Sequence, residues 1–185
     1  MDRKEKHMTK KKLKIIGIIT AFVLAFPIHF LYKWLPNPVF AIFFPVNESI
    51  WEHMKMLTTT FLLTGLLEYI IIKWKNIKVK NFWIGTYIES IISITIYLII
   101  FLPFYFNMPT NMFITIGTML ITMIITKLIG YYIISTKKNI IPEYITIILI
   151  MITYITFGIL TYHPPKNFLF FDTEEEKYGI NIYHI

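Results

Sequence analysis

The segment 45–55 places two carboxylates and an imidazole close together in the sequence Pro-Val-Asn-Glu-Ser-Ile-Trp-Glu-His-Met-Lys. A proline followed by Asn47 predicts a chain stop and then a helix capped by Asn47, with Glu48 in its first turn. On such a helix Glu48 and Glu52 share a face, and His53 adjoins Glu52. These groups are suited to hold a divalent metal ion, or to catalysis with Glu52 or His53 as base. The same spacing is also typical of a capped helix end, so the pattern leaves both interpretations open.

A second set of candidate ligands lies in the tail 163–185, which begins with His163-Pro164-Pro165. The two prolines predict a sharp helix end, and Asp172 follows an apolar stretch at 168–171. That stretch is too apolar for a free tail, so we expect the tail to pack on the rest of the protein. His163 and Asp172 would then add to the metal ligands of the first segment. His29, in contrast, is interpreted as a packed and hydrogen-bonded residue.

Three charged residues stand inside long apolar runs: Glu68, Glu89 and Lys127. A central carboxylate costs roughly 2.5–3.5 kcal/mol on membrane insertion scales, so such groups need a partner. Glu89 belongs to a polar helix face, and Lys127 is a candidate partner for either carboxylate; the other members of that face are Thr86, Ser90, Ser93 and Tyr97. One interpretation is a proton or cation path, and the other is polar contact that holds helices together.

The elements that position these residues are five apolar runs of about 17 to 23 residues, each long enough to cross a bilayer. We therefore predict an all-α integral membrane bundle, with Pro103 ending or kinking the third helix. A cleaved signal peptide is the competing interpretation of the first run. The predicted parts are a basic tail at 1–12, spans near 13–34, 56–72, 82–102, 112–134 and 144–162, and the tail 163–185.

The positive charges alternate from one connection to the next. Thirteen of the 18 lysines and arginines lie in the N-terminal segment, the second-to-third connection and the fourth-to-fifth connection. The opposite side has four, at Lys33, Lys55, Lys166 and Lys177. The positive-inside rule then predicts a cytoplasmic N-terminus and an external C-terminal tail. This topology places the tail on the same side as segment 45–55.

Composition excludes several classes of function. The chain of 185 residues is 56% hydrophobic and 16% charged, below the charge content of about 25% in soluble proteins. Because it has no cysteine, disulfides, thiolate metal sites and cysteine nucleophiles are excluded. Its net charge of +7 comes from residues at the ends of apolar runs, which is typical of membrane proteins, so we expect no nucleic-acid partner. No cofactor is identified by sequence.

Two motifs together resemble a known family. Segment 45–55 resembles a Pro-Val-Asn-Glu-Ser-x-Trp-Glu-His-x-Lys signature, and Pro164-Pro165, Leu169–Asp172 and Tyr178–Ile180 resemble the tail pattern that accompanies it. In both motifs the chain resembles a family of small bacterial multi-spanning membrane proteins, which is known as domain of unknown function 6512. The chain departs from that pattern after Asp172, where it has Thr-Glu-Glu-Glu instead of a short turn, and it runs on to Ile185. The resemblance implies no activity.

The sequence therefore predicts a multi-pass protein of a bacterial cell membrane, with the lipid bilayer as its partner and a protein partner or homo-oligomer as open alternatives. A small transport or channel-like component, or an accessory subunit, is the first functional hypothesis, with Glu68 and Glu89 handling a cation or proton. The second is a membrane enzyme acting on a lipid or lipid-linked substrate through the external carboxylates and histidines. The third is a structural or assembly protein.

Overall fold

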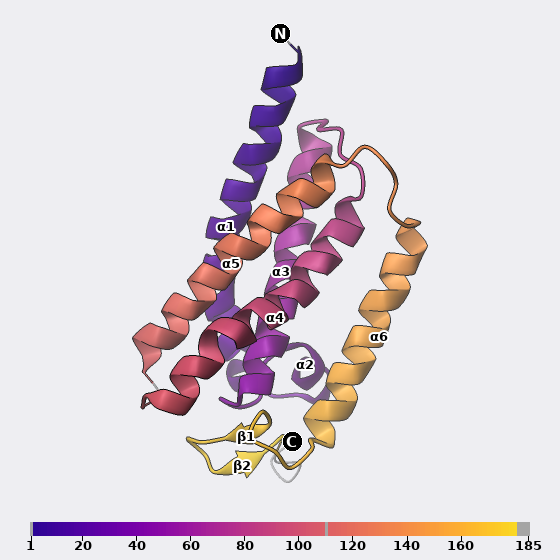
Figure 1. Ribbon diagram of the computed structural model, residues 1–185. Coiled ribbons are helices and arrows are strands. Elements are labelled where there is room, and N and C mark those ends of the chain that lie inside the picture. The colour runs from indigo at the N-terminus through magenta and orange to yellow at the C-terminus, as the bar shows by residue number, and fades with distance from the viewer. Residues whose placement is uncertain (1, 110, 181–185) are drawn as a thin grey trace.

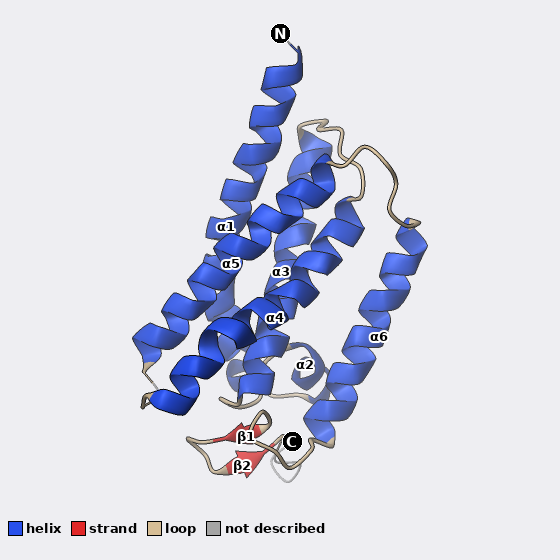
Figure 2. Ribbon diagram, viewed as in Figure 1, coloured by secondary structure: helices blue, strands red, loops and turns tan. Residues whose placement is uncertain are grey.

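The computed structural model describes residues 2–109 and 111–180, and positions 181–185 of the predicted tail lie outside this part. Within the described ranges the chain forms six helices and one small hairpin (Figure 1, Figure 2). The helices are α1 (Asp2–Trp34), α2 (Pro38–Phe43), α3 (Ile50–Trp74), α4 (Phe82–Asn107), α5 (Met112–Ser135) and α6 (Glu143–Tyr162). The strands are β1 (Phe171–Asp172) and β2 (Lys177–Tyr178).

Five helices are long and apolar enough to cross a membrane: Lys10–Trp34 of α1, and all of α3, α4, α5 and α6. The shortest, α6, has 20 residues, which corresponds to about 30 Å at 1.5 Å per residue. Large apolar side chains such as Ile19, Ile99 and Ile155 point outward and are exposed, while many threonines, serines and charged residues are buried. Such a protein has an apolar outer surface and many polar groups in its interior, which suits it to lipid as the surrounding solvent. The predicted helical membrane bundle is confirmed.

Four helices form the body of the bundle. α4 packs between α3 and α5, and α1 packs against both α3 and α5. α6 lies to one side, where it contacts α2 and α4 (Figure 1). Small side chains let α1 approach closely, because Ala21 and Ala25 are buried in the main apolar core with Leu57 and Phe61 of α3.

The loops divide between two ends of the bundle, which are named here for their contents. The lysine-rich end holds the N-terminus and the α3–α4 and α5–α6 connections, and the tail end holds α2 and the β-hairpin (Figure 1). The positive-inside rule predicts that the lysine-rich end is cytoplasmic.

The tail closes the opposite end of the bundle. In the hairpin, Phe171 pairs with Tyr178 and Asp172 with Lys177, antiparallel. Before the hairpin, the Trp51 amide donates to the Leu169 carbonyl at 2.8 Å. The rings of Trp51 and Phe170 stack with centroids 4.8 Å apart. The apolar stretch 168–171 thus lies against the start of α3.

Two helices extend beyond the predicted spans. Of the two alternatives for Pro103, a helix end or a kink, the helix end is excluded, because α4 continues through Pro103 to Asn107. A proline near a helix end disturbs few hydrogen bonds, and here the Asn107 side-chain amide donates to the Pro103 carbonyl at 2.7 Å. Residues 2–12, which fall in the predicted basic tail, form the first part of the continuous helix α1.

The start of the second span also differs from the prediction. α3 begins at Ile50, and Ser49 rather than Asn47 is its N-cap, with the Ser49 hydroxyl accepting from the Glu52 amide at 3.4 Å. Asn47 instead accepts from the Ser49 amide at 2.9 Å and donates to the Gly179 carbonyl at 3.0 Å. Glu48 therefore precedes the helix, and it does not share a helical face with Glu52.

Candidate functional site

Glu48 lies at the tail end of the bundle with one histidine on each side. Its Oε1 is 3.1 Å from Nε2 of His29, and its Oε2 is 3.6 Å from Nε2 of His53. The two imidazole rings are 5.6 Å apart between centroids. One ligand atom from each residue falls within 4.8 Å of the other two, an arrangement that could hold a metal ion. We call His29, Glu48 and His53 the outer triad.

The three residues come from three different parts of the chain. His29 lies in the last two turns of α1, Glu48 in the loop before α3, and His53 in the first turn of α3. Ser49, the N-cap of α3, directly follows Glu48, so the carboxylate lies just before the helix and faces His53 in its first turn. The side chains are 20%, 38% and 11% exposed, respectively, so the site is partly accessible.

Hydrogen bonding determines which nitrogen of His53 faces the carboxylate. Nδ1 lies 3.0 Å from the Ser49 carbonyl oxygen, which can only accept, so Nδ1 carries a proton and donates it. In a neutral ring, Nε2 then has its lone pair directed toward Glu48. Such a pair of electron-rich atoms requires a proton or a metal ion between them. A histidine that donates its other ring N–H to a backbone carbonyl is also the usual arrangement of a metal ligand.

The electrostatics of Glu48 favour its ionised form. The hydrogen bond with His29 lowers the pKa of the Glu48 carboxyl below its ordinary value, against the opposing effect of partial burial. The charges of His53 and His29, where these rings are protonated, and the charge of Lys33 lower this pKa further. A carboxylate that stays ionised is available as a ligand or as an ion-pair partner.

Asp172 does not join the outer triad but positions it. Its Oδ2 accepts from the Glu48 amide at 2.9 Å, and its Oδ1 accepts from the amides of Glu174 and Glu175 at 2.8 and 3.1 Å. Asp172 is fully buried, so it links the hairpin to the loop that carries Glu48. The two segments therefore meet through the backbone of Glu48 and not through its side chain.

Glu52 does not contribute to the triad either. It is fully buried and pairs with Lys55 at 2.6 Å, which makes it a poor candidate for a catalytic base or a metal ligand. Its Oε2 also accepts from the Val46 amide at 3.1 Å. Lys55 donates to the Ala41 carbonyl at 2.7 Å and to the Thr161 hydroxyl at 2.9 Å. This ion pair connects α3 to α2 and α6.

His163 is also outside the triad. It is the exposed C-cap of α6, whose amide donates to the Ile159 carbonyl at 2.8 Å. Sequence reasoning therefore included His163 and omitted His29. The signal for His29 was present, because the end of the first span must lie on the same side as segment 45–55. A histidine inside a long apolar run nevertheless reads as packed when it is taken alone.

The intramembrane charges form a separate cluster within the four-helix body. Lys127 donates to Glu68 at 3.0 Å and to Glu89 at 2.8 Å. Lys14 donates to the same two carboxylates, at 3.1 and 2.5 Å respectively. All four side chains are nearly or fully inaccessible. We call Lys14, Glu68, Glu89 and Lys127 the charge quartet; its formal charges sum to zero.

The quartet is closely packed. A Cβ atom added to Gly17 would overlap the carboxylate of Glu68, and one added to Gly130 would overlap that of Glu89. The sequence identified three of its four members but assigned Lys14 to the basic segment before the first span. Lys14 is the member of that segment furthest into the apolar run, which was the available signal.

The fold and these sites define a multi-pass helical membrane protein with buried charge pairs and an accessible histidine–carboxylate triad at one end. A family model with the description "Family of unknown function (DUF6512)" matches residues 1–180, so the chain belongs to this family. The resemblance of segment 45–55 is thereby confirmed. No curated protein and no solved structure matches the chain.

Proposed function

We propose that this protein is a metal-dependent membrane enzyme whose outer triad binds a divalent transition-metal ion such as Zn²⁺. The observation that carries the proposal is the convergence of His29, Glu48 and His53, with ligand atoms within 4.8 Å of one another. A tetrahedral zinc site with bonds near 2.0–2.1 Å spaces its ligand atoms about 3.3 Å apart. The two carboxylate–imidazole distances, 3.1 and 3.6 Å, lie on either side of that value.

The number and type of ligands support catalysis rather than a purely structural ion. Structural zinc sites are closed by four protein ligands, whereas catalytic sites have three and keep one position open. Two histidines and one glutamate belong to the second class. A metal ion so held would lower the pKa of a bound water and polarise a carbonyl or phosphoryl group. The partial exposure of all three side chains leaves access for such a substrate.

The position of the triad suggests the class of substrate. His29 and His53 lie close to the ends of membrane spans, at the end that the positive-inside rule predicts to be external. Hydrolysis of, or group transfer from, a lipid or lipid-linked compound in the outer leaflet of a bacterial cytoplasmic membrane fits that position. Glu48 and the two histidines would hold the ion, while Asp172 and Ser49 would orient Glu48 and His53.

A transport role for Glu68 and Glu89 receives less support. Each carboxylate is neutralised by two lysines and packed against a glycine, which favours polar contact between helices over a conducting path. An ion-conducting carboxylate should face a hydrated cavity. The quartet is therefore best explained as the element that holds α1, α3, α4 and α5 together.

The first experiment is metal binding by the purified full chain in detergent, after removal of metal with EDTA. Titration with Co²⁺ reports the site through the visible absorption of a four- or five-coordinate complex, and mass spectrometry of the metal content gives the stoichiometry. We expect about one ion per chain, as in a single catalytic zinc site. His29→Ala, Glu48→Gln and His53→Ala should each weaken binding at least about tenfold. His163→Ala, outside the triad, is the matched control.

Two results would contradict the proposal. If the wild-type protein binds no Co²⁺ or Zn²⁺, or if the triad variants bind like His163→Ala, segment 45–55 is a capped helix end in a structural protein. If the ion binds, turnover of fluorogenic lipid esters and phosphodiesters in proteoliposomes tests the enzymatic part. That turnover should disappear with EDTA and return with Zn²⁺. If the protein binds the metal but turns over none of these lipids, the enzymatic part of the proposal is contradicted.

A further inference from the structure

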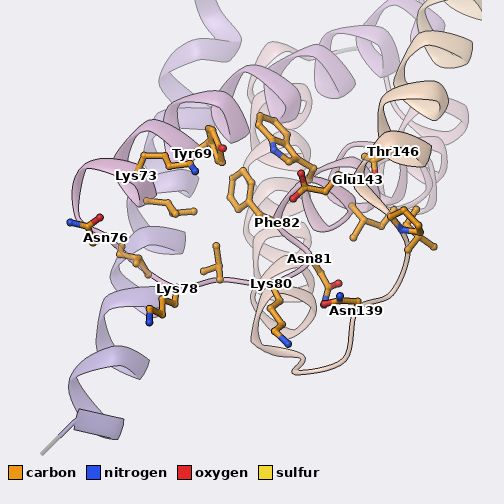
Figure 3. Close-up of a pocket in the computed structure, with 17 residues that line it drawn as sticks. Tyr69, Lys73, Asn76, Lys78, Lys80, Asn81, Phe82, Asn139, Glu143 and Thr146 are labelled. Carbon is orange, nitrogen blue, oxygen red and sulfur yellow. The ribbon is translucent and has the colours of Figure 1, made fainter.

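A large cavity lies at the other end of the bundle, among the connections of the lysine-rich end. It has a volume of 660 Å³, within the range of about 300–1,000 Å³ typical of ligand sites. The end of α3, the α3–α4 connection, the start of α4, the α5–α6 connection and the start of α6 all line it (Figure 3). Neither the outer triad nor the charge quartet contributes to it.

The charge of this cavity favours an anion. Lys73, Lys78 and Lys80 line it, against a single acidic residue, Glu143. Figure 3 shows the lysines extending from the end of α3 and from the connection that follows. The ammonium of Lys73 also lies 5.2 Å from the centre of the Tyr69 ring, which holds it beside the cavity.

Two helices begin at the cavity without a side-chain cap. Asn81 precedes α4 and Pro142 precedes α6, and neither provides a side-chain hydrogen bond to the first turn. The amide groups and positive dipole ends of helix N-termini bind anions such as phosphate. Asn81 has another role: its side chain donates to the Lys138 carbonyl at 2.8 Å and accepts from the Ile140 amide at 2.9 Å. It thereby fixes the α5–α6 connection beside the start of α4.

A buried hydroxyl provides independent evidence for a ligand. Thr146 of α6 lines the cavity and is fully buried, and its hydroxyl has no hydrogen-bond partner among the described residues. A buried hydroxyl without a partner costs about 1–3 kcal/mol, which a ligand oxygen would relieve. Lysines, open helix N-termini and a free hydroxyl around one cavity are together the chemistry of a phosphate site.

The aromatic residues of the cavity indicate which phosphate compound it holds. Tyr69, Phe82 and Trp83 line it and pack on one another, with centroids 4.9 to 5.7 Å apart. All three lie within the last two turns of α3 or the first turn of α4, at the boundary of the membrane spans. Tyrosine and tryptophan at this depth are typical of contact with lipid headgroups.

From these observations we propose that the cavity binds the phosphate headgroup of an anionic phospholipid from the cytoplasmic leaflet. Lys73, Lys78 and Lys80 would neutralise the phosphate, and the open N-termini of α4 and α6 together with Thr146 would donate hydrogen bonds to it. The aromatic residues would contact the glycerol and the upper part of the acyl chains. This site is independent of the outer triad.

The test is lipid binding by the delipidated full chain in detergent, measured by native mass spectrometry. Phosphatidylglycerol is compared with zwitterionic phosphatidylcholine, and inorganic phosphate and glycerol 3-phosphate are added as soluble competitors. We expect specific binding of about one phosphatidylglycerol per chain, not displaced by millimolar soluble phosphate. The paired variant Lys78→Gln with Lys80→Gln should weaken it at least about tenfold, because it removes two of the charged hydrogen-bond donors to the phosphate.

Matched controls separate the cavity from general surface charge. Lys137→Gln with Lys138→Gln removes the same charge from the same end of the bundle, but these lysines do not line the cavity, and binding should change less than about twofold. Thr146→Val keeps the shape and the charge and should weaken binding about tenfold through the lost hydroxyl. The melting temperature of each variant checks that it is folded.

Three outcomes would overturn the proposal. Equal binding of phosphatidylglycerol and phosphatidylcholine would show that charge is not recognised. An equal loss in the two lysine pairs, with no loss in Thr146→Val, would reduce the effect to surface electrostatics. Displacement of the lipid by inorganic phosphate at equal concentration would assign the cavity to a soluble anion instead.

Discussion

Lys14 of α1 and Glu89 of α4 are 75 positions apart in sequence, yet the ammonium of one donates to Oε1 of the other at 2.5 Å inside the bundle. With Glu68 of α3 and Lys127 of α5, each helix of the four-helix body supplies one charge, and each ammonium contacts both carboxylates. A set of charges that is balanced only when all four helices are in place favours one arrangement of those helices over others.

Neutralising one member of this quartet should destabilise the protein strongly. Lys127→Met leaves two buried carboxylates with a single ammonium, and an uncompensated buried charge costs about 3–5 kcal/mol. We expect the free energy of unfolding, measured by titration with SDS in mixed micelles, to fall by about that amount. Lys138→Met, at an exposed position near the end of the same helix, should change it by less than about 0.5 kcal/mol.

A double variant tests whether balance or contact matters. Lys127→Met with Glu89→Gln removes one charge of each sign and should cost less than the sum of the two single changes, because the quartet stays neutral. If the loss of unfolding free energy in the double variant equals the sum of the losses in the two single variants, Lys127 and Glu89 act independently. The quartet would then not be a single unit.

The space for Glu89 depends on a glycine. A Cβ at Gly130 of α5 would overlap the Glu89 carboxylate, whereas one at Gly117 of the same helix would meet no atom within 4 Å among the described residues beyond its own helix backbone. Gly130→Ala should therefore lower the free energy of unfolding by about 1–3 kcal/mol through overpacking. Gly117→Ala should leave it unchanged or raise it slightly, since alanine favours helix. Equal effects of the two changes would contradict this packing.

The fold was predictable from sequence to the extent that it depends on lipid as solvent. Runs of apolar residues long enough to cross a bilayer determine the five spans, and all their predicted ends lie within about three residues of the helix ends except the start of α3 and the end of α4. The ends themselves depend on local hydrogen bonds. Asn47 and Ser49 are both good N-caps; in the structure Ser49 caps α3, while Asn47 bonds to the carbonyl of Gly179, a residue 132 positions away that a local pattern does not bring in.

The candidate site was predictable in part for the same reason. Hydropathy and charge placed the tail beside segment 45–55, so the contribution of Asp172 was within reach. The sequence could not show which of the two carboxylates, Glu48 or Glu52, would be available to bind a metal ion. The two residues have the same side chain and differ only in the groups that they contact. Glu52 meets Lys55 inside the protein, and Glu48 meets two histidines near the surface. Helix phase similarly decides that Lys14 enters the core while Lys11 and Lys12 stay exposed.

Asp172 should influence metal affinity without being a ligand. Asp172→Asn keeps an oxygen for the amides of Glu174 and Glu175, but its amide nitrogen would face the amide of Glu48, donor against donor. Glu48 would lose its anchor, and outer contacts of this kind change metal affinity about 10–100-fold. Co²⁺ titration of the variant measures this loss directly.

Glu174→Gln is the control for that change, because its exposed side chain leaves the backbone hydrogen bond to Asp172 in place. It should bind Co²⁺ like the wild-type protein. If Asp172→Asn also binds normally while the hairpin remains folded, the position of Glu48 does not depend on the tail.

The metal-free protein should lose stability in acid through the outer triad. The hydrogen bond with His29 lowers the pKa of Glu48 below the ordinary value of 4.5. Between the lowered and the ordinary pKa the unfolded chain binds more protons, so the free energy of unfolding rises with pH. This contribution is complete above pH 4.5 and is lost as the pH falls through the folded-state pKa. Thermal unfolding in detergent with EDTA, from about pH 6 to 3, measures it.

Comparison of variants isolates the contribution of Glu48 from that of other carboxylates. Glu48→Gln should remove the contribution of the Glu48 charge. The melting temperature of this variant should therefore lie below that of the wild-type protein near pH 6, and the difference between them should shrink as the pH falls below 4.5. His29→Phe should shrink the difference in the same way, because Glu48 then titrates closer to its ordinary pKa in the folded state. Glu174→Gln should run parallel to the wild-type curve. A constant difference for Glu48→Gln across this range would mean that the pKa of Glu48 is the same in the folded and the unfolded chain, so that the two histidines do not stabilise its charge.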